Sequence, residues 1–168
     1  MRIFLGVTIF ILAIMVVIVV VNQSGINLRD YIPGMSNRVT VYVDQTPFRV
    51  GIADTQPLRQ QGLSGTEQLD SDEGLLFVFE EEGLYGFWMK DMNYPIDILW
   101  FDESLSLVHI ERNVSPDTFP TSFVSDEPAR FVLELNAFVA ESFNIDEGAT
   151  LTLPSSAIPA DLRRSLQQ

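Results

Sequence analysis

The strongest constraint on this chain is an apolar run near its N-terminus. Residues 3–21 read IFLGVTIFILAIMVVIVVV, which is 19 consecutive residues without a charge. As a helix this run would span roughly 28 Å, close to the hydrocarbon thickness of a bilayer. A cleavable signal peptide would have a shorter apolar region and a small-x-small cleavage site after it, and a buried core helix is a third alternative. The length of the run and the absence of such a site favour an uncleaved transmembrane anchor over residues 1–22.

The charges that flank this run predict its orientation. Arg2 and the amino terminus lie on one side, and the first charge on the other side is Arg29. Under the positive-inside rule the N-terminus is cytoplasmic. The polar, Gly- and Pro-containing stretch 23–37 then reads as a linker, and the rest of the chain is expected to be extracytoplasmic on a single-pass membrane protein.

Composition excludes several classes of function. The chain has 23 acidic and 10 basic residues and a net charge of −13, which is unfavourable for binding nucleic acid. It contains no cysteine, so disulfides, thiolate zinc sites, iron–sulfur clusters and a cysteine nucleophile are excluded. One histidine cannot form a multi-histidine metal site. No phosphate-binding or dinucleotide-binding glycine motif is present. We therefore predict no cofactor and no metal.

Short β-type runs dominate the rest of the sequence. The stretches 39–43 and 48–53 predict a hairpin, and further strands are expected at 74–79, 87–90, 96–101, 105–112, 130–135 and 149–153. Thr55, as the N-cap, predicts a helix that ends at Gly62, and a second helix is expected over 137–143 with Asn136 as its N-cap. With connections this short, most neighbouring strands should be antiparallel. The prediction is a mostly β or α+β fold: a compact antiparallel β-barrel-like domain over 38–155 with two short helices, followed by a polar tail, 156–168.

Four sequence blocks occur in an order that resembles a known family. They are Gly62-Leu63-Ser64-Gly65, Gly74-Leu75-Leu76-Phe77-Val78-Phe79, Phe87-Trp88-Met89-Lys90-Asp91-Met92 with Pro95-Ile96-Asp97-Ile98, and Pro128-Ala129-Arg130-Phe131-Val132-Leu133-Glu134-Leu135. Together they resemble the bacterial and archaeal family of domain of unknown function 192, over about residues 39–153. The resemblance implies a compact, mostly β fold and no known reaction.

The chain departs from that family in two places. Many members carry a cysteine pair in the loop before the Arg-x-Val-Leu-Glu strand, whereas this chain has none in 115–122. Ser64 takes a position where the first family motif usually has Met. Any function that depends on those thiols is therefore absent here.

Asp97 is the first candidate for chemistry, because it is an acid inside an apolar strand. A buried carboxylate is costly unless it is hydrogen-bonded or paired. One interpretation is structural, with Asp97 accepting backbone N–H groups of the 93–95 turn or pairing with Lys90 or Arg130. The other makes Asp97 a general acid or base, or a contact to a ligand.

Glu134 is the second candidate, in the strand RFVLEL. Strand alternation places Arg130 and Glu134 on one face, so a structural network across strands is one interpretation. In the other, Asp97 and Glu134 line one cleft and act as a hydrolytic acid/base pair.

The aromatic residues near Asp97 supply a candidate binding surface. If Trp88, Tyr94 or Trp100 reaches the surface beside Asp97, it would offer a flat apolar platform next to a polar group. The candidate contacts to a ligand are Trp88, Lys90, Asp91, Asp97 and Arg130.

The sequence therefore favours a membrane-anchored extracytoplasmic module of the cell envelope with a binding or accessory role. Its expected partners are the membrane, through the N-terminal helix, and an envelope protein, a glycan or a peptide. The alternative is a small envelope hydrolase that uses Asp97 and Glu134, with Lys90 or Arg130 stabilising charge. A purely structural domain is a third hypothesis.

Overall fold

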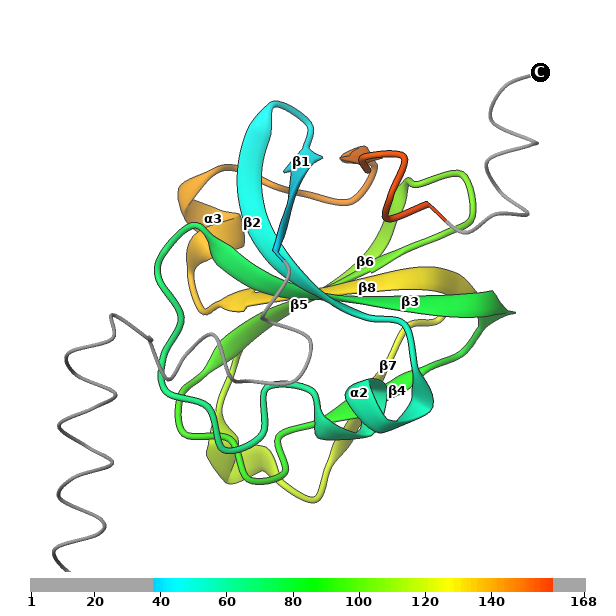
Figure 1. The fold of residues 1–168 in the computed structure, drawn as a ribbon. Coiled ribbons are helices and arrows are strands. Elements are labelled where there is room, and N and C mark those ends of the chain that lie inside the picture. The colour runs from blue at the N-terminus through cyan, green and yellow to red at the C-terminus, as the bar shows by residue number, and fades with distance from the viewer. Residues whose placement is uncertain (1–37, 159–168) are drawn as a thin grey trace, which may run out of the picture. The chain divides into compact units, whose positions relative to one another are not determined.

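A computed structural model describes residues 38–158, in which two β-sheets carry the fold (Figure 1). The predicted anchor (1–22) and linker (23–37) lie outside the described residues, as does most of the predicted tail (156–168). Within 38–158 no helix is long and apolar enough to cross a bilayer.

The strands and helices follow the expected order along the chain. The elements are β1 (Val39–Val43), β2 (Thr46–Ala53), α2 (Gln56–Gln61), β3 (Glu73–Gly83), β4 (Gly86–Trp88), β5 (Ile96–Phe101), β6 (Leu107–Val114), η2 (Pro116–Thr118), β7 (Ser122–Val124), β8 (Ala129–Asn136), α3 (Val139–Ser142) and β9 (Leu151–Thr152).

The larger sheet has seven strands in the order β6-β5-β8-β3-β2-β1-β9. Every neighbouring pair is antiparallel except β2 and β3, which are parallel. That pair is joined by α2, because parallel neighbours need a crossover connection. The second sheet is the antiparallel pair β4 and β7.

The seven-stranded sheet curls so that its two edge strands meet near their ends. An isolated antiparallel bridge joins Ser106 to Thr150, and the Leu107 N–H donates to the Ala149 carbonyl at 2.8 Å. The result is a curled half-barrel, so the β-barrel-like prediction is confirmed at this level.

The two faces of the sheet bury separate apolar groups. The inner face holds the main core, which includes Val41, Phe48, Leu99, Leu133 and Leu135. The outer face is covered by α2, β4 and β7, which lie below the sheet in Figure 1. Its buried side chains include Leu63, Phe77, Phe87, Met89, Ile98 and Trp100. The outer face is the one that carries the candidate site.

The two predicted helices had different outcomes. The first is confirmed, since α2 begins after Thr55 and ends at Gly62. The second is shorter than predicted, and Asn136 is not its N-cap. Asn136 is the last residue of β8, and its side-chain amide donates to the carbonyls of Leu69 and Asp70. Phe138 occupies the N-cap position of α3 with a φ of 67°, and its apolar side chain has no acceptor to cap the helix.

Candidate functional site

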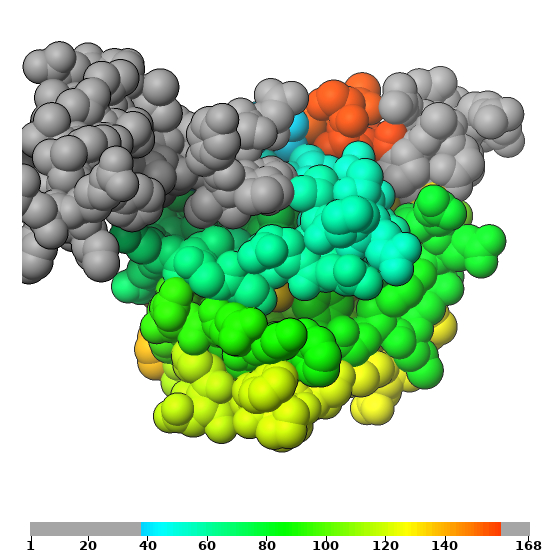
Figure 2. Space-filling view, turned by 60° about the horizontal axis from the view of Figure 1, so that its bottom comes forward, coloured from blue at the N-terminus to red at the C-terminus, as the bar shows by residue number. Residues whose placement is uncertain are grey.

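A pocket opens between α2, the loop after it, and strand β4. Its volume is about 210 Å³. Figure 2 shows a hollow between the teal surface that includes α2 and the green surface formed by the chain around β3 and β4. The side chains and backbone that line the pocket are those of Gln56, Arg59, Gln60, Gln61, Gly62, Leu63, Ser64, Phe77, Phe79, Tyr85, Gly86, Phe87, Trp88, Met92 and Glu134.

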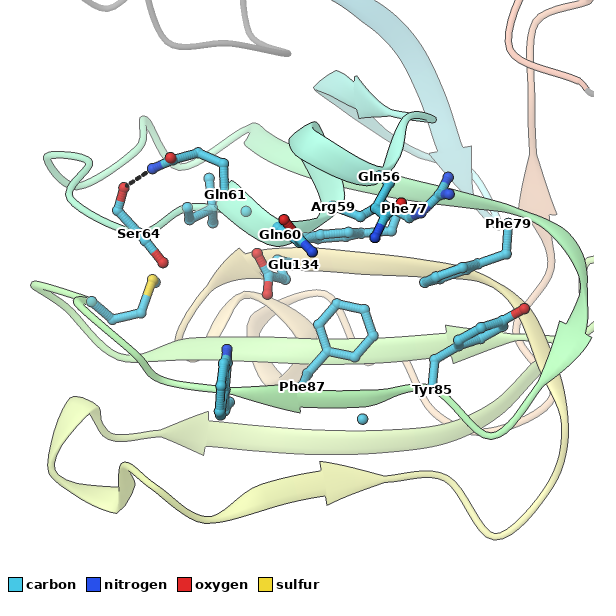
Figure 3. Close-up of a pocket in the computed structure, with 15 residues that line it drawn as sticks. Gln56, Arg59, Gln60, Gln61, Ser64, Phe77, Phe79, Tyr85, Phe87 and Glu134 are labelled. Atoms are coloured by element: carbon cyan, nitrogen blue, oxygen red, sulfur yellow. Dashed lines mark hydrogen bonds between the residues drawn. The ribbon is translucent and has the colours of Figure 1, made fainter.

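Glu134 supplies the acidic group of this pocket. It lies on the outer face of β8, opposite Leu75 of β3 and Ile98 of β5. The residue is only 5% exposed, and its Oε2 atom is buried without a hydrogen-bond partner. Figure 3 shows the carboxyl group among the side chains of Gln60, Phe77 and Phe87. A buried polar atom without a partner costs free energy, so this carboxyl is an unmet acceptor that faces the pocket.

Burial also changes the acidity of Glu134. Loss of solvation disfavours the charged form and raises the pKa of its carboxyl from 4.5 to about 8. At neutral pH the group is therefore mostly an uncharged carboxylic acid. In that form it offers one O–H donor and one carbonyl acceptor.

Aromatic rings form much of the pocket wall. Phe77 and Phe87 meet edge to face, with ring centroids 4.8 Å apart. Phe79 and Tyr85 are stacked in parallel at 3.5 Å. Trp88 is 54% exposed and so can contact a bound molecule. The pocket combines flat apolar area with one buried polar group, which is the usual composition of a small-molecule site.

Arg59 is the cationic side chain of the lining, and it is already engaged. Its Nη1 atom donates to the carbonyl oxygens of Asp54 at 2.7 Å and Val78 at 2.8 Å. Its guanidinium also lies over the ring of Phe79, 5.2 Å from the centroid. These contacts hold Arg59 at the wall, and it forms no ion pair with Glu134.

The loop after α2 is fixed against the turn after β4. Ser64 Oγ donates to the Lys90 carbonyl, and the Gly65 N–H donates to the Asp91 carbonyl, both at 2.7 Å. Gln61 Nε2 donates to the Ser64 carbonyl at 2.8 Å (Figure 3). Gly62 turns the chain with a φ of 51°, and the place its Cβ would take is only 4.0 Å from Glu134 Oε2. A side chain there would partly cover the carboxyl.

Asp97 lies on the other face of the sheet and has a structural environment. It is fully buried and pairs with Leu135 of the inner core. Its Oδ1 accepts the N–H groups of Asn113 at 2.8 Å and Phe138 at 3.3 Å, and its Oδ2 accepts that of Ala140 at 2.9 Å. The hypothesis of one cleft lined by both acids is therefore wrong, because the sheet separates the two carboxyl groups.

Asp97 does accept backbone N–H groups, as the structural interpretation predicted, but the donors are not the predicted ones. The expected N–H groups of the 93–95 turn and the expected cations Lys90 and Arg130 do not contact it; instead it binds the start of α3 and the residue Asn113, which has a φ of 51°. These contacts stabilise backbone conformations that non-glycine residues adopt at a cost.

Among the predicted ligand contacts, only Trp88 lines the pocket, along with the acid Glu134. Lys90 and Asp91 are exposed, and their backbone carbonyls hold the loop after α2. Arg130 is buried, donating from Nε to the Phe79 carbonyl and from Nη1 to Glu103, both at 3.3 Å. Arg130 shares the outer face with Glu134, as alternation predicted, but does not contact it.

The predicted aromatic platform consists of Trp88 alone. Tyr94 is buried, with its hydroxyl 2.8 Å from Thr66 Oγ1, and Trp100 is fully buried. Trp88 lines the same pocket as Glu134, and Asp97 does not line it. Among residues 38–158 no cluster of three or more His, Asp or Glu side chains could hold a metal ion.

The role of α2 as a wall of the site was not predicted from the sequence. Gln56, Arg59, Gln60 and Gln61 all lie on this helix, and no pattern in the sequence marks them. The other pocket walls could have been found from the sequence, because all four sequence blocks quoted above contribute to this one pocket. Each block supplies one of the lining residues Gly62, Phe77, Phe87 and Glu134.

The comparisons with known proteins agree with this fold. Residues 39–153 match the model of the DUF192 family, described as "Uncharacterized ACR, COG1430". The chain belongs to the DUF192 family. No curated protein matches this DUF192 chain.

Two solved structures are similar to this DUF192 domain. One, from Sinorhizobium meliloti 1021, is described as a "putative transcription regulator"; it is 30% identical with a TM-score of 0.63, over 68% of this chain and 90% of that one. The other, from Novosphingobium aromaticivorans DSM 12444, is a protein of unknown function; it is 27% identical with a TM-score of 0.66, over 69% of this chain and 85% of that one.

Proposed function

We propose that this DUF192 protein is a membrane-anchored, extracytoplasmic binding module, and that its ligand occupies the Glu134 pocket. The uncharged run 3–21 supports the anchor, and the position of Arg2 supports the orientation. The observation that carries the binding role is the carboxyl of Glu134, which is buried, has an unpartnered Oε2 and faces an open aromatic pocket. A bound molecule would supply the missing partner.

Binding is favoured over hydrolysis by the composition of the pocket. Paired-carboxylate hydrolysis needs two acids about the scissile bond. Glu134 is the only acidic residue among those that line the pocket, and Asp97 lies on the opposite face of the sheet. The description of the Sinorhizobium protein as a regulator does not carry over readily, because a net charge of −13 opposes binding to DNA.

Ligand-detected NMR with a small-fragment library tests the binding role. The full chain, purified in a mild non-ionic detergent, is compared with the variant Gln60→Trp. Gln60 is exposed at the pocket wall, so the larger indole should fill the mouth of the pocket. Gln45→Trp, in the turn between β1 and β2, is the matched control.

We expect fragments that bind the parent chain and Gln45→Trp, and that lose binding in Gln60→Trp. Fragments that bind all three proteins equally would place the binding elsewhere. A library that yields no fragment sensitive to Gln60→Trp would overturn the proposal.

A further inference from the structure

Among residues 38–158, no side chain forms an ion pair with the Glu134 carboxyl, and its Oε2 atom has no hydrogen-bond partner. Burial is the cause of its raised pKa, and no neighbouring cation acts to lower it. Arg59 is held by the carbonyls of Asp54 and Val78. The exposed Lys90 is not among the residues that line the pocket. The pocket therefore has a buried place for one positive charge, and no residue of the described part of the chain fills it.

The pocket wall suits an organic cation. The faces of Trp, Tyr and Phe attract cations, and this attraction is strongest where water is excluded. Trp88, Tyr85, Phe77 and Phe87 all contribute to the lining. A positive group that reaches Glu134 would pass along aromatic surface for the length of its stem. An apolar stem that ends in a charge matches this arrangement.

The approach to the pocket is also acidic. A second hollow shares the wall residues Arg59, Phe79 and Tyr85 with the pocket, and it is lined in addition by Asp54, Glu80 and Glu81. These three carboxyl side chains belong to exposed residues. Together with the net charge of −13 they favour the arrival of cations and disfavour anions.

We infer that the ligand of the pocket carries a protonated amine on an apolar stem, with Glu134 as its anionic partner. This inference rests on the proposed function. With a volume of about 210 Å³, the pocket takes a group the size of an amino-acid side chain or a small arylalkylamine. When the ammonium group binds, Glu134 loses its proton to the buffer, and the complex contains a carboxylate and an ammonium.

The release of a proton on binding predicts how the affinity of the ligand depends on pH. Below pH 8, binding of an ammonium group releases a proton, so its affinity should rise by up to about tenfold per pH unit and level off above pH 8. A neutral ligand held by the O–H of Glu134 would instead lose affinity above pH 8. The other titratable groups of the pocket lining are Arg59 on α2 and Tyr85 before β4, and the neighbouring strands present Leu75, Phe77 and Ile98 to Glu134.

Calorimetry with two matched probes tests the inference on the full chain. The probes are phenethylamine and phenethyl alcohol, which differ in charge and little in shape, measured at pH 6, 7 and 8.5. The variant Glu134→Gln keeps the size of the uncharged acid and cannot become an anion. Glu147→Gln makes the same change at an exposed position outside the pocket and controls for binding to the acidic surface.

We expect phenethylamine to bind more tightly at each higher pH up to 8.5, and phenethyl alcohol to show no such rise. Glu134→Gln should weaken phenethylamine binding at pH 8.5 by about tenfold or more and change alcohol binding little. Glu147→Gln should change neither. If the alcohol binds as tightly as the amine at pH 8.5, the inference of a cationic ligand is wrong, while the proposal of a binding pocket is supported. If neither probe binds and the fragment library also yields no ligand of the pocket, both the binding role and the cationic ligand are wrong.

Binding of short peptides distinguishes two possible sources of the ammonium group: a lysine side chain of a protein and a free amine. Among residues 38–158 the strand β4 pairs only with β7, and its residues border the pocket, so an extended chain could place a lysine there. The probes are acetyl-Ala-Ala-Lys-Ala-Ala-amide and its norleucine counterpart. A lysine peptide that binds more tightly than phenethylamine supports a protein source, and the reverse order supports a free amine. Norleucine binding equal to lysine binding would contradict the inference.

Discussion

Asp97 and Glu134 lie on neighbouring, hydrogen-bonded strands and point to opposite faces of the sheet. Asp97 pairs with Leu135, whereas Glu134 pairs with Ile98, so the two acids are one register step apart on β5 and β8. Because successive side chains of a strand alternate between faces, that single step sends one carboxyl into the inner core and the other into the outer pocket. The first acid accepts backbone N–H groups in the core, and the second lines the pocket.

Asp97→Ala should destabilise the protein without a specific effect on the pocket. The change leaves the N–H groups of Asn113, Phe138 and Ala140 without their acceptor. The Ala140 N–H is buried, and the bonds from Asn113 and Phe138 are part-buried. A buried group left without a partner costs about 1–3 kcal/mol and the other two add less, so we expect a loss of about 3 kcal/mol in the free energy of unfolding. Denaturant titration measures it. Asp126→Ala, at an exposed position, should stay within about 0.5 kcal/mol of the parent. Lost ligand affinity with unchanged stability would return Asp97 to the site.

Glu134→Gln should change how stability depends on pH. Between pH 4.5 and 8 the folded protein keeps a proton on Glu134 that the unfolded chain has released. The ionised state is therefore penalised in the fold, and the contribution of this group to the free energy of unfolding falls by up to about 1.4 kcal/mol per pH unit as pH rises.

The variant removes that slope, because its amide does not titrate. Measured by urea unfolding, the stability of Glu134→Gln relative to the parent should increase by about 3 kcal/mol between pH 5 and pH 8. Glu147→Gln should show no such trend. A constant difference across this range would mean that Glu134 is ionised in the fold.

Two tryptophans should respond differently to removal. Trp88 is 54% exposed and contacts Phe119, so Trp88→Ala should cost less than about 1 kcal/mol of stability while it weakens ligand binding several-fold. Trp100 is fully buried, and its Nε1 donates to the Tyr85 carbonyl at 3.1 Å. Trp100→Ala should cost about 3–5 kcal/mol. Thermal and denaturant unfolding compare the two, and equal costs would contradict the assignment of Trp88 to the pocket wall.

The full chain should fractionate with membranes and expose its C-terminal domain outside the cytoplasm. The uncharged run 3–21 and Arg2 are the basis of this expectation. Protease added to intact spheroplasts of an expressing bacterium should remove a C-terminal epitope, and carbonate washing should leave the chain in the membrane. Replacing Ile11 and Val17 by Lys should release it. An epitope that is protected until the cells are lysed would contradict the orientation.

Local patterns were enough to predict most strands and the first helix. The hairpin of β1 and β2, the apolar run of β5 and the Thr55–Gly62 helix depend on near neighbours in the sequence, and the structure has all three. The short strand β7 was not predicted, and the start of α3 was predicted at 137 with Asn136 as N-cap, whereas the helix begins at Val139. The start of α3 depends on Asp97, which is 43 residues away along the chain from Ala140, and no local pattern reports such a contact.

The site was harder to predict because it depends on register. Alternation correctly placed Arg130 and Glu134 on one face, but it could not relate β8 to β5 without knowing which residues pair. The same applies to α2, whose role as a wall follows from the parallel crossover between β2 and β3. Glu134 was identified from the sequence as an acid in an apolar strand, and in the structure it lines the pocket without Asp97.

A titration of the Glu134 carboxyl by carbon-13 NMR tests the central claim most directly. The full chain, labelled at the side-chain carboxyl of glutamate, is compared with Glu134→Gln to assign the signal, with and without phenethylamine. We predict a midpoint at about pH 8 in the free protein and a midpoint at least one unit lower when the amine saturates the pocket. A midpoint near 4.5 in the free protein would show that the carboxyl is solvated and ionised. That result would contradict the claim that Glu134 is a buried, protonated acid that binds the ligand.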